Sequence, residues 1–149
     1  MFRDAIIKFM KIDTKVCKKV NTTGHKNIKN GWILELNSDR DKWTEFIKGQ
    51  VYLTVVNPKK QKGFHLHKLK INHITCIKGR VTVGVFNGKK VQEFNIGEDN
   101  FLSIKIPPKK PFAIFNRGTN DAYVINYCYP SYDSKVEEQE EVEITWNPA

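Results

Sequence analysis

Residues 62–68, Lys62-Gly63-Phe64-His65-Leu66-His67-Lys68, carry two histidines one residue apart. Aromatic and branched residues after a glycine are typical of a β-strand, and we expect one over residues 63–69. Successive side chains of a strand point to opposite faces, so His65 and His67 should share a face about 7 Å apart, at ~3.3 Å per residue. Two such imidazoles can bind a metal, one can act as a general base, or both can be plain surface or core histidines.

Runs of the same kind lie on both sides of this stretch. Short β-branched and aromatic segments alternate with turn residues, a pattern typical of all-β sandwiches and barrels. We expect further strands at residues 32–36, 50–56, 72–77, 81–86, 89–95, 103–106, 112–116, 122–128 and 141–146. These strands, with little helix between them, predict an all-β double-sheet barrel.

Three local features qualify this pattern. Asn37-Ser38-Asp39 predicts a turn that caps a short helix containing Trp43 and Phe46. Asn87-Gly88 predicts a two-residue hairpin turn, because both residues tolerate a positive φ. Residues 6–16 fit neither the helical nor the strand period. No repeat or linker divides the sequence, so we expect one domain over residues 1–149, with an N-terminal segment at 1–30 and the barrel at 31–149.

The charge is large and unevenly placed. The 149 residues contain 25 Lys+Arg and 16 Asp+Glu, a net charge of +9. Residues 133–143 hold six acidic residues and one lysine, a balance of −5, which leaves +14 on the rest. A body this basic favours an anionic partner, either nucleic acid or a phosphorylated small molecule. The acidic run itself is expected to be a solvated edge leading into the last strand, or a surface that pairs with a second subunit.

The cysteines and the hydropathy pattern bear on the compartment. Cys17, Cys76 and Cys128 are widely spaced and odd in number, which argues against a disulfide framework. No run reaches the roughly 18 apolar residues of a membrane helix, and residues 1–10 lack the uninterrupted apolar core of a signal peptide. We therefore expect a cytoplasmic protein without membrane contact.

The spacing around the two histidines matches the frame of the two cupin motifs. Gly63 to Gly79 has the spacing of the first motif, and residues 107–116 have that of the second. However, Asn72 stands at the position of the metal-binding Glu, and Phe112 at that of the third His. An amide and a phenyl ring cannot replace those ligands, so we expect no metal and no other cofactor.

A cupin of this kind resembles the enzymes of nucleotide-sugar metabolism. The segments 49–54, 62–68 and 106–108, together with Tyr132 and residues 144–146, are similar to short members of the dTDP-4-dehydrorhamnose 3,5-epimerase family. The Gly-Phe-His-Leu-His-Lys stretch and the following Gly79-Arg80-Val81 are also similar to the dTDP-4-dehydro-6-deoxyglucose 3,4-ketoisomerases. The resemblance implies a double-stranded β-helix, the cupin jelly-roll barrel.

The resemblance also implies a mechanism and a set of site residues. A histidine removes a proton next to the C4 ketone of a dTDP-linked 4-keto-6-deoxyhexose, and the proton returns to another face or atom. His65 matches the family's base, His67 the second histidine of the ketoisomerases, and Tyr52 is the third candidate catalytic residue. The candidate substrate-binding residues are Lys62, which takes the place of a phosphate-contacting Arg, and Lys70, Asn72, Arg80, Asn126 and Tyr132.

Two departures set this chain apart from intact 3,5-epimerases. Asn126 stands where those enzymes place an acid Tyr, and we expect no C-terminal Asp to orient the base, because the sequence ends at Ala149. These differences favour a ketoisomerase or a divergent epimerase.

Two other function classes remain open. A cupin without turnover can bind a nucleotide sugar or another anion. A basic β-barrel can bind single-stranded nucleic acid, although aromatic residues at strand spacing are more often core residues. The family resemblance also implies a homodimer in which the N-terminal strand joins the partner's sheet. His73 matches no motif and is expected on the surface.

Overall fold

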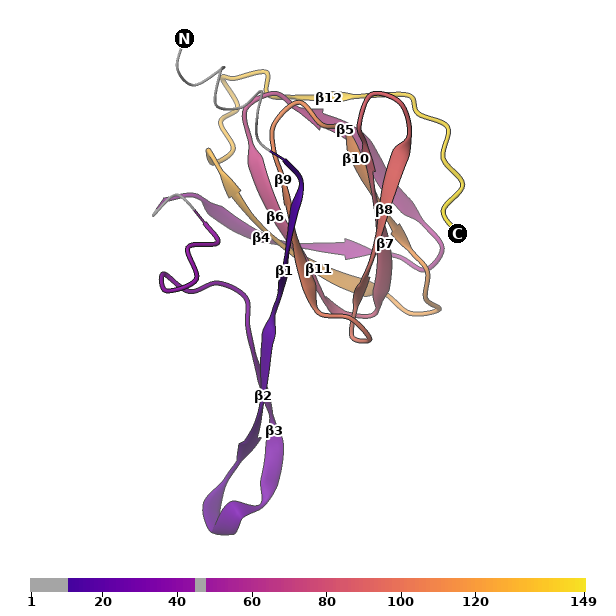
Figure 1. Cartoon of the computed structure of the whole chain (residues 1–149). Coiled ribbons are helices and arrows are strands. Elements are labelled where there is room, and N and C mark those ends of the chain that lie inside the picture. Colours follow the sequence, from indigo (N-terminus) through magenta and orange to yellow (C-terminus); the bar gives the residue numbers. More distant parts are fainter. Residues whose placement is uncertain (1–10, 45–47) are drawn as a thin grey trace.

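The structure, a computed structural model, describes residues 11–44 and 48–149. Two five-stranded antiparallel sheets face each other (Figure 1). The first sheet has the order β1-β9-β6-β11-β4 and the second β12-β5-β10-β7-β8. The strands are β1 (Asp13–Val16), β2 (Lys18–Thr23), β3 (Lys29–Glu35), β4 (Gln50–Val56), β5 (Gln61–His67), β6 (Ile71–Lys78), β7 (Arg80–Phe86), β8 (Val91–Gly97), β9 (Leu102–Ile106), β10 (Phe112–Asn116), β11 (Ala122–Tyr129) and β12 (Gln139–Glu141).

The chain crosses repeatedly between the two sheets. β5, β7, β8 and β10 belong to the second sheet, whereas β6, β9 and β11 belong to the first. This alternation is that of a double-stranded β-helix, the jelly-roll barrel of the cupins, and it confirms the expected fold class.

Side chains that point inward from both sheets form the core. They include Ile74 on β6, Val83 and Val85 on β7, and Val124 on β11, all of which are almost completely buried. Burying a side chain of this size contributes about 1.5–3 kcal/mol to folding. Toward the start of β6 and the end of β11 the inward rows become polar, with the buried side chains of Asn72 and Asn126. The barrel therefore has an apolar body and a polar end.

The hairpin of β2 and β3 stands apart from the barrel. It projects from the body (Figure 1) and holds a short 3₁₀ turn, His25–Asn27, at its tip. The barrel was expected to begin at residue 31. Residues 31–35 belong to β3, which pairs with β2 alone, so these residues lie outside the two large sheets. β1 instead joins the first sheet, where it pairs with β9 of the same chain. Residues 6–10 of the ambiguous N-terminal stretch lie outside the described residues.

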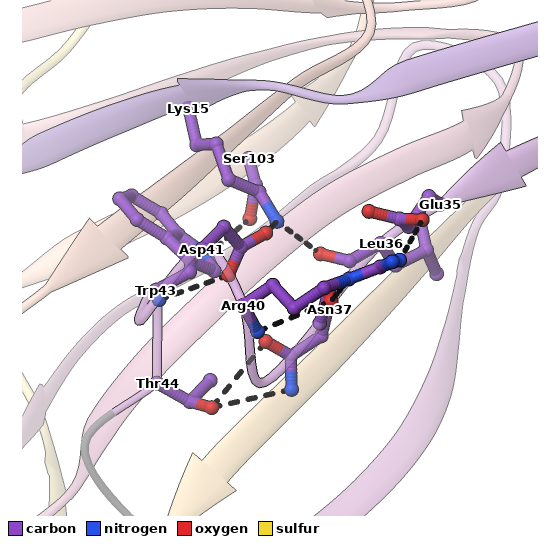
Figure 2. Close-up of polar contacts among 10 residues, drawn as sticks. Lys15, Glu35, Leu36, Asn37, Arg40, Asp41, Trp43, Thr44 and Ser103 are labelled. Carbon is purple, nitrogen blue, oxygen red and sulfur yellow. Dashed lines mark hydrogen bonds and ion pairs between the residues drawn. The ribbon is translucent and has the colours of Figure 1, made fainter.

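The described part of the expected helix around Trp43 is not helical. Residues 39–42 form a turn and residues 43–44 are irregular, and Asp41 Oδ1 accepts the Trp43 backbone N–H at 3.0 Å. Phe46 lies outside the described residues. Trp43 is instead buried against the outer face of the first sheet, where its indole N–H donates to Ser103 Oγ at 3.2 Å (Figure 2). Lys15 anchors the same loop by bonds to Leu36 O and Asp41 Oδ2.

His73 was expected on the surface, and that prediction is wrong. Its ring lies under Trp43, with the two ring centroids 5.6 Å apart, and its side chain is buried. The apolar cover that Trp43 supplies is not visible in the local sequence around His73.

One turn prediction and one strand prediction also need correction. The loop between β7 and β8 has four residues, 87–90, because Asn87 Oδ1 accepts the backbone N–H groups of Lys89 and Lys90. Of the expected pair, Gly88 alone has a positive φ. Near the end of the chain, the strand expected at 141–146 is replaced by β12 at Gln139–Glu141, and residues 142–149 form no strand.

Candidate active site

The two histidines of β5 lie on the inner wall of the barrel. His65 is the register partner of Phe112 on β10, whose side chain is part of the core, and the His67 ring stacks on that of Phe112 with centroids 5.6 Å apart. Phe64 points to the outer face, where it packs against Trp146. The strand alternation expected from the sequence is therefore present.

Gly63 permits this close pairing of β5 and β10. Its φ is +89°, and a Cβ at this position would lie 2.6 Å from Phe112 O. A larger residue would push β5 away from β10 and displace the histidines that follow. The close approach of the two strands therefore explains why a glycine precedes Phe64 and the two histidines.

The acidic run of the sequence pairs with the histidine strand. β12 lies at the edge of the second sheet, where Glu141 is the register partner of His65 and Gln139 that of His67. As expected from the sequence, the run is largely a solvated edge, since all three residues of β12 are exposed. It also places carboxylates beside both histidines.

His67 and Glu138 form a tight, buried pair. His67 Nδ1 lies 2.9 Å from Glu138 Oε2, and their side chains are 8% and 12% exposed. Glu138 Oε1 also accepts the backbone N–H of Lys70 at 3.1 Å, and the Glu138 carbonyl accepts that of Lys68 at 2.8 Å. Sequence analysis missed Glu138, and its position in an acidic run gives no local signal that it faces a histidine.

His65 is more open. Its side chain is 32% exposed, and its Nε2 lies 4.0 Å from an oxygen of Glu141, which is 92% exposed. Burial lowers the pKa of His65, the neighbouring His67 and the positive charge of Lys62 lower it further, and the negative charge of Glu141 raises it. Near neutral pH its imidazole is therefore mostly neutral, the form that a general base requires.

A hydrogen-bonded cluster fills the polar end of the barrel. Asn126 Nδ2 donates to Tyr52 Oη and to Asn72 Oδ1, both at 2.8 Å. Burial raises the pKa of Tyr52, so its phenol stays protonated and can donate. Asn72 Nδ2 and Asn126 Oδ1 are buried and have no hydrogen-bond partner among the described residues. The cluster therefore offers one unused donor and one unused acceptor.

Lys70 and Tyr132 lie beside this cluster. Lys70 is buried, and its Nζ lies 5.8 Å from the centroid of the exposed Tyr132 ring. Both residues line a cavity of about 160 Å³, whose wall also includes Glu138 and Pro130. Cys128 points inward on β11, like Asn126. Burial raises the pKa of its thiol, and the positive charge of Lys70 partly offsets this increase.

Lys62 and Arg80 are placed differently. Lys62 is exposed on β5 and close enough to His65 to affect its pKa. Arg80 begins β7, pairs with Gly97 and lies 3.9 Å from Asp99, whereas Val85 near the other end of β7 is the residue next to Phe112. Arg80 is therefore separate from the histidines, whereas Lys62 acts on His65, and the Lys70 backbone N–H shares the Glu138 carboxylate with His67.

Two further observations concern ligands and membranes. Within residues 11–44 and 48–149, no group of three or more His, Cys, Asp or Glu side chains is arranged to hold a metal ion. In the same part of the chain, no helix is long and apolar enough to span a membrane.

The chain and its fold are similar to proteins that are named as sugar isomerases or epimerases. The chain is 28% identical, over 113 residues, to the probable low-salt glycan biosynthesis epimerase Agl13 of Haloferax volcanii, covering 69% of this chain and 72% of Agl13. The fold is similar to that of a dTDP sugar isomerase from Desulfovibrio desulfuricans G20, with a TM-score of 0.75, 19% identity, and 89% and 83% of the two chains covered. It is also similar to QdtA, a sugar 3,4-ketoisomerase from Thermoanaerobacterium thermosaccharolyticum in complex with TDP, with a TM-score of 0.67, 15% identity, and 89% and 88% covered.

A family model decides the classification. Residues 37–139, more than half of the chain, match the model described as the polysaccharide biosynthesis C-terminal domain. The matched range contains β4 to β11, the two histidines and the amide cluster. This chain belongs to the polysaccharide biosynthesis C-terminal domain family.

Proposed function

We propose that this protein is a metal-independent isomerase or epimerase of a dTDP-linked 4-keto-6-deoxyhexose, with His65 as the general base. The observation that carries the proposal is the meeting of a neutral, accessible histidine with a second, carboxylate-bound histidine on the inner wall of the barrel. The relatedness to sugar epimerases and isomerases supports the same reaction class.

The reaction needs a base, a stabilised oxyanion and a proton donor. The C4 ketone acidifies the C–H bonds at C3 and C5. His65 takes one of these protons, the C–H electron pair forms the C=C bond of an enolate, and the C4 oxygen becomes negative. Delivery of a proton to the same carbon from the opposite face, by a second group, gives epimerisation. In 3,4-ketoisomerisation, the C3 hydroxyl loses a proton, the C4 oxygen gains one and a proton is delivered to C4, so that the ketone moves to C3.

The cluster of Tyr52, Asn126 and Asn72 supports a substrate that carries a hydroxyl or an enol oxygen. Its unused donor and acceptor, Asn72 Nδ2 and Asn126 Oδ1, are satisfied together by a group that can both accept and donate a hydrogen bond. Exchanging N and O in both amides still leaves one donor and one acceptor, so this inference does not depend on the amide orientation. A sugar hydroxyl meets the requirement, whereas a phosphate does not.

The basic residues around the barrel support an anionic ligand. Lys62 on β5 and the buried Lys70 are the two lysines that we assign to the pyrophosphate side of the substrate, with Tyr132 beside it. Arg80 is left out of this assignment, because its place on β7 is remote from the histidines.

Deuterium exchange tests the proposed function. The protein is incubated with dTDP-4-keto-6-deoxyglucose in heavy water, and the product is analysed by NMR. Deuterium at C3 or C5 of the 4-ketone, or at C4 of the 3-ketone, in the wild type, and its loss in His65→Asn, is the expected result. Binding of the nucleotide sugar without any exchange, there or with other 4-keto nucleotide sugars, would overturn catalysis in favour of a binding protein.

We also propose a homodimer and a cytoplasmic location. The outer face of the edge strand β4 exposes Val51, Leu53 and Val55, an apolar stripe suited to a second copy of this chain. The three cysteines are free thiols, in keeping with a reducing compartment. Light scattering tests the dimer: we expect twice the chain mass for the wild type and a monomer for Leu53→Lys, and a monomeric wild type would contradict it.

A further inference from the structure

Glu138 holds His67 in one orientation through several bonds. Its Oε2 lies 2.9 Å from His67 Nδ1, and its Oε1 accepts the Lys70 N–H at 3.1 Å. The backbone of Glu138 is fixed as well, because its carbonyl accepts the Lys68 N–H at 2.8 Å. The carboxylate therefore cannot turn away from the ring without breaking bonds to β5 and to the segment that follows it.

The direction of the hydrogen bond follows from its partners. Glu138 Oε1 already accepts the backbone N–H of Lys70, and a carboxylate can only accept hydrogen bonds. The proton between His67 and Glu138 therefore belongs to Nδ1. In the neutral ring, Nε2 is then the nitrogen with a free lone pair.

His65 has no equivalent partner among residues 11–44 and 48–149. Its nearest carboxylate is 4.0 Å away on the 92% exposed side chain of Glu141, too far for a hydrogen bond. The two histidines of the strand are thus unequal: one is open and weakly held, and the other is buried, stacked on Phe112 and locked by a carboxylate.

We propose that Glu138 is a positioning residue, which fixes His67 as the Nδ1–H tautomer so that its Nε2 takes the proton of the C3 hydroxyl and passes it to the C4 oxygen of the enolate. This inference rests on the proposed function for its catalytic part. It also assigns a role to the acidic segment before β12, which carries the carboxylate to a histidine about seventy residues away in the sequence.

The isosteric variant Glu138→Gln separates positioning from packing. A glutamine can still accept a hydrogen bond from the Lys70 N–H, but its side-chain NH₂ group, turned toward His67, donates a hydrogen bond to Nδ1. The ring must then carry its proton on Nε2. Glu140→Gln is the matched control, since Glu140 lies two residues away, is 49% exposed and pairs at 3.8 Å with Lys68.

The first measurement is independent of activity. Nitrogen-15 NMR of histidine-labelled protein above pH 8, with the His67 signals assigned from His67→Asn, reports which ring nitrogen carries the proton. We expect the Nδ1–H tautomer in the wild type and in Glu140→Gln, and the Nε2–H tautomer in Glu138→Gln. An Nε2–H tautomer in the wild type would overturn the proposal, and this result does not depend on the folding of Glu138→Gln.

The second measurement is turnover of the 4-keto nucleotide sugar. We expect kcat to fall by about 100-fold in Glu138→Gln, with KM changed by less than about 2-fold, as for loss of one acid–base group. An unchanged kcat in a folded Glu138→Gln protein would contradict the positioning role. If the wild type turns over no such sugar, the proposed function fails while the tautomer measurement still decides the role of Glu138.

Discussion

His65 on β5 and Glu141 on β12 are register partners whose side chains approach to 4.0 Å. This contact is the outer of two carboxylate–histidine pairs, and it is open to solvent. At this distance and exposure the attraction is screened by water, and its effect on the pKa of His65 is small. Burial outweighs it and lowers the pKa of His65 below the ordinary value of 6.5.

The pH dependence of catalysis should report this lowered pKa. As the pH falls, His65 gains its proton only below pH 6.5, so the acid limb of kcat/KM is expected there. Removal of the charge in Glu141→Gln should move the limb further down, by less than about one unit. The remaining titratable groups that act on His65 are His67 and Lys62, which both lower its pKa.

The sign of the stability effect follows from the same shift. The unfolded state binds the His65 proton at a higher pH than the folded state does. The contribution of His65 to stability is therefore full above pH 6.5 and is lost as the pH falls through the folded pKa. Proton NMR titration of the His65 ring, assigned from His65→Asn, checks both statements, and a midpoint above 6.5 would refute them.

Gly84 should be required for the seating of the C-terminal tail. A Cβ at this position would lie 2.8 Å from Trp146 Cζ2 and from Val91 Cγ1. Gly84→Ala should displace the indole, which then loses its 2.8 Å bond to Glu93 and its contact with Phe64, at a cost of about 1–3 kcal/mol. Urea unfolding and the indole N–H signal of Trp146 measure the two effects.

A second variant identifies the cause of that loss. If the clash with the indole is responsible, adding Trp146→Ala to Gly84→Ala should cost much less than Trp146→Ala alone costs the wild type. Additive losses would show that Val91 or the strand backbone is the source of the strain instead.

Local patterns predicted the barrel well and the pairings between distant segments poorly. The runs around Gln50–Val56 and Phe112–Asn116 give strands at the expected residues, because alternation and turn residues are local signals. The contact of Glu138 with His67 depends on which edge of the sheet receives β12, and no local signal in the acidic run encodes this. The burial of His73 under Trp43 has the same origin.

Trp43 should stabilise the fold without taking part in the reaction. It is buried on the outer face of the first sheet, with its indole N–H on Ser103 and the Lys105 ammonium 4.8 Å from the ring centroid. Trp43→Ala should cost about 3–5 kcal/mol, as for other large-to-small changes at buried aromatic residues. Trp43→Phe keeps most of the packing but loses the hydrogen bond, so about 1 kcal/mol is expected. Urea unfolding measures both, and equal losses would show that packing is not the main contribution.

The amide cluster should contribute to both the stability of the fold and turnover. Asn72→Leu leaves Asn126 with one acceptor fewer, and Asn126→Leu leaves Asn72 and Tyr52 without their shared donor, so each change should cost about 1–3 kcal/mol. The double variant removes both unused polar groups, Asn72 Nδ2 and Asn126 Oδ1, together with the bond between the amides. Its loss of stability should therefore be smaller than the sum of the single losses, while turnover is abolished in all three proteins. Urea unfolding combined with the deuterium exchange assay tests this prediction. Additive destabilisation with retained exchange would mean that the cluster is only part of the core.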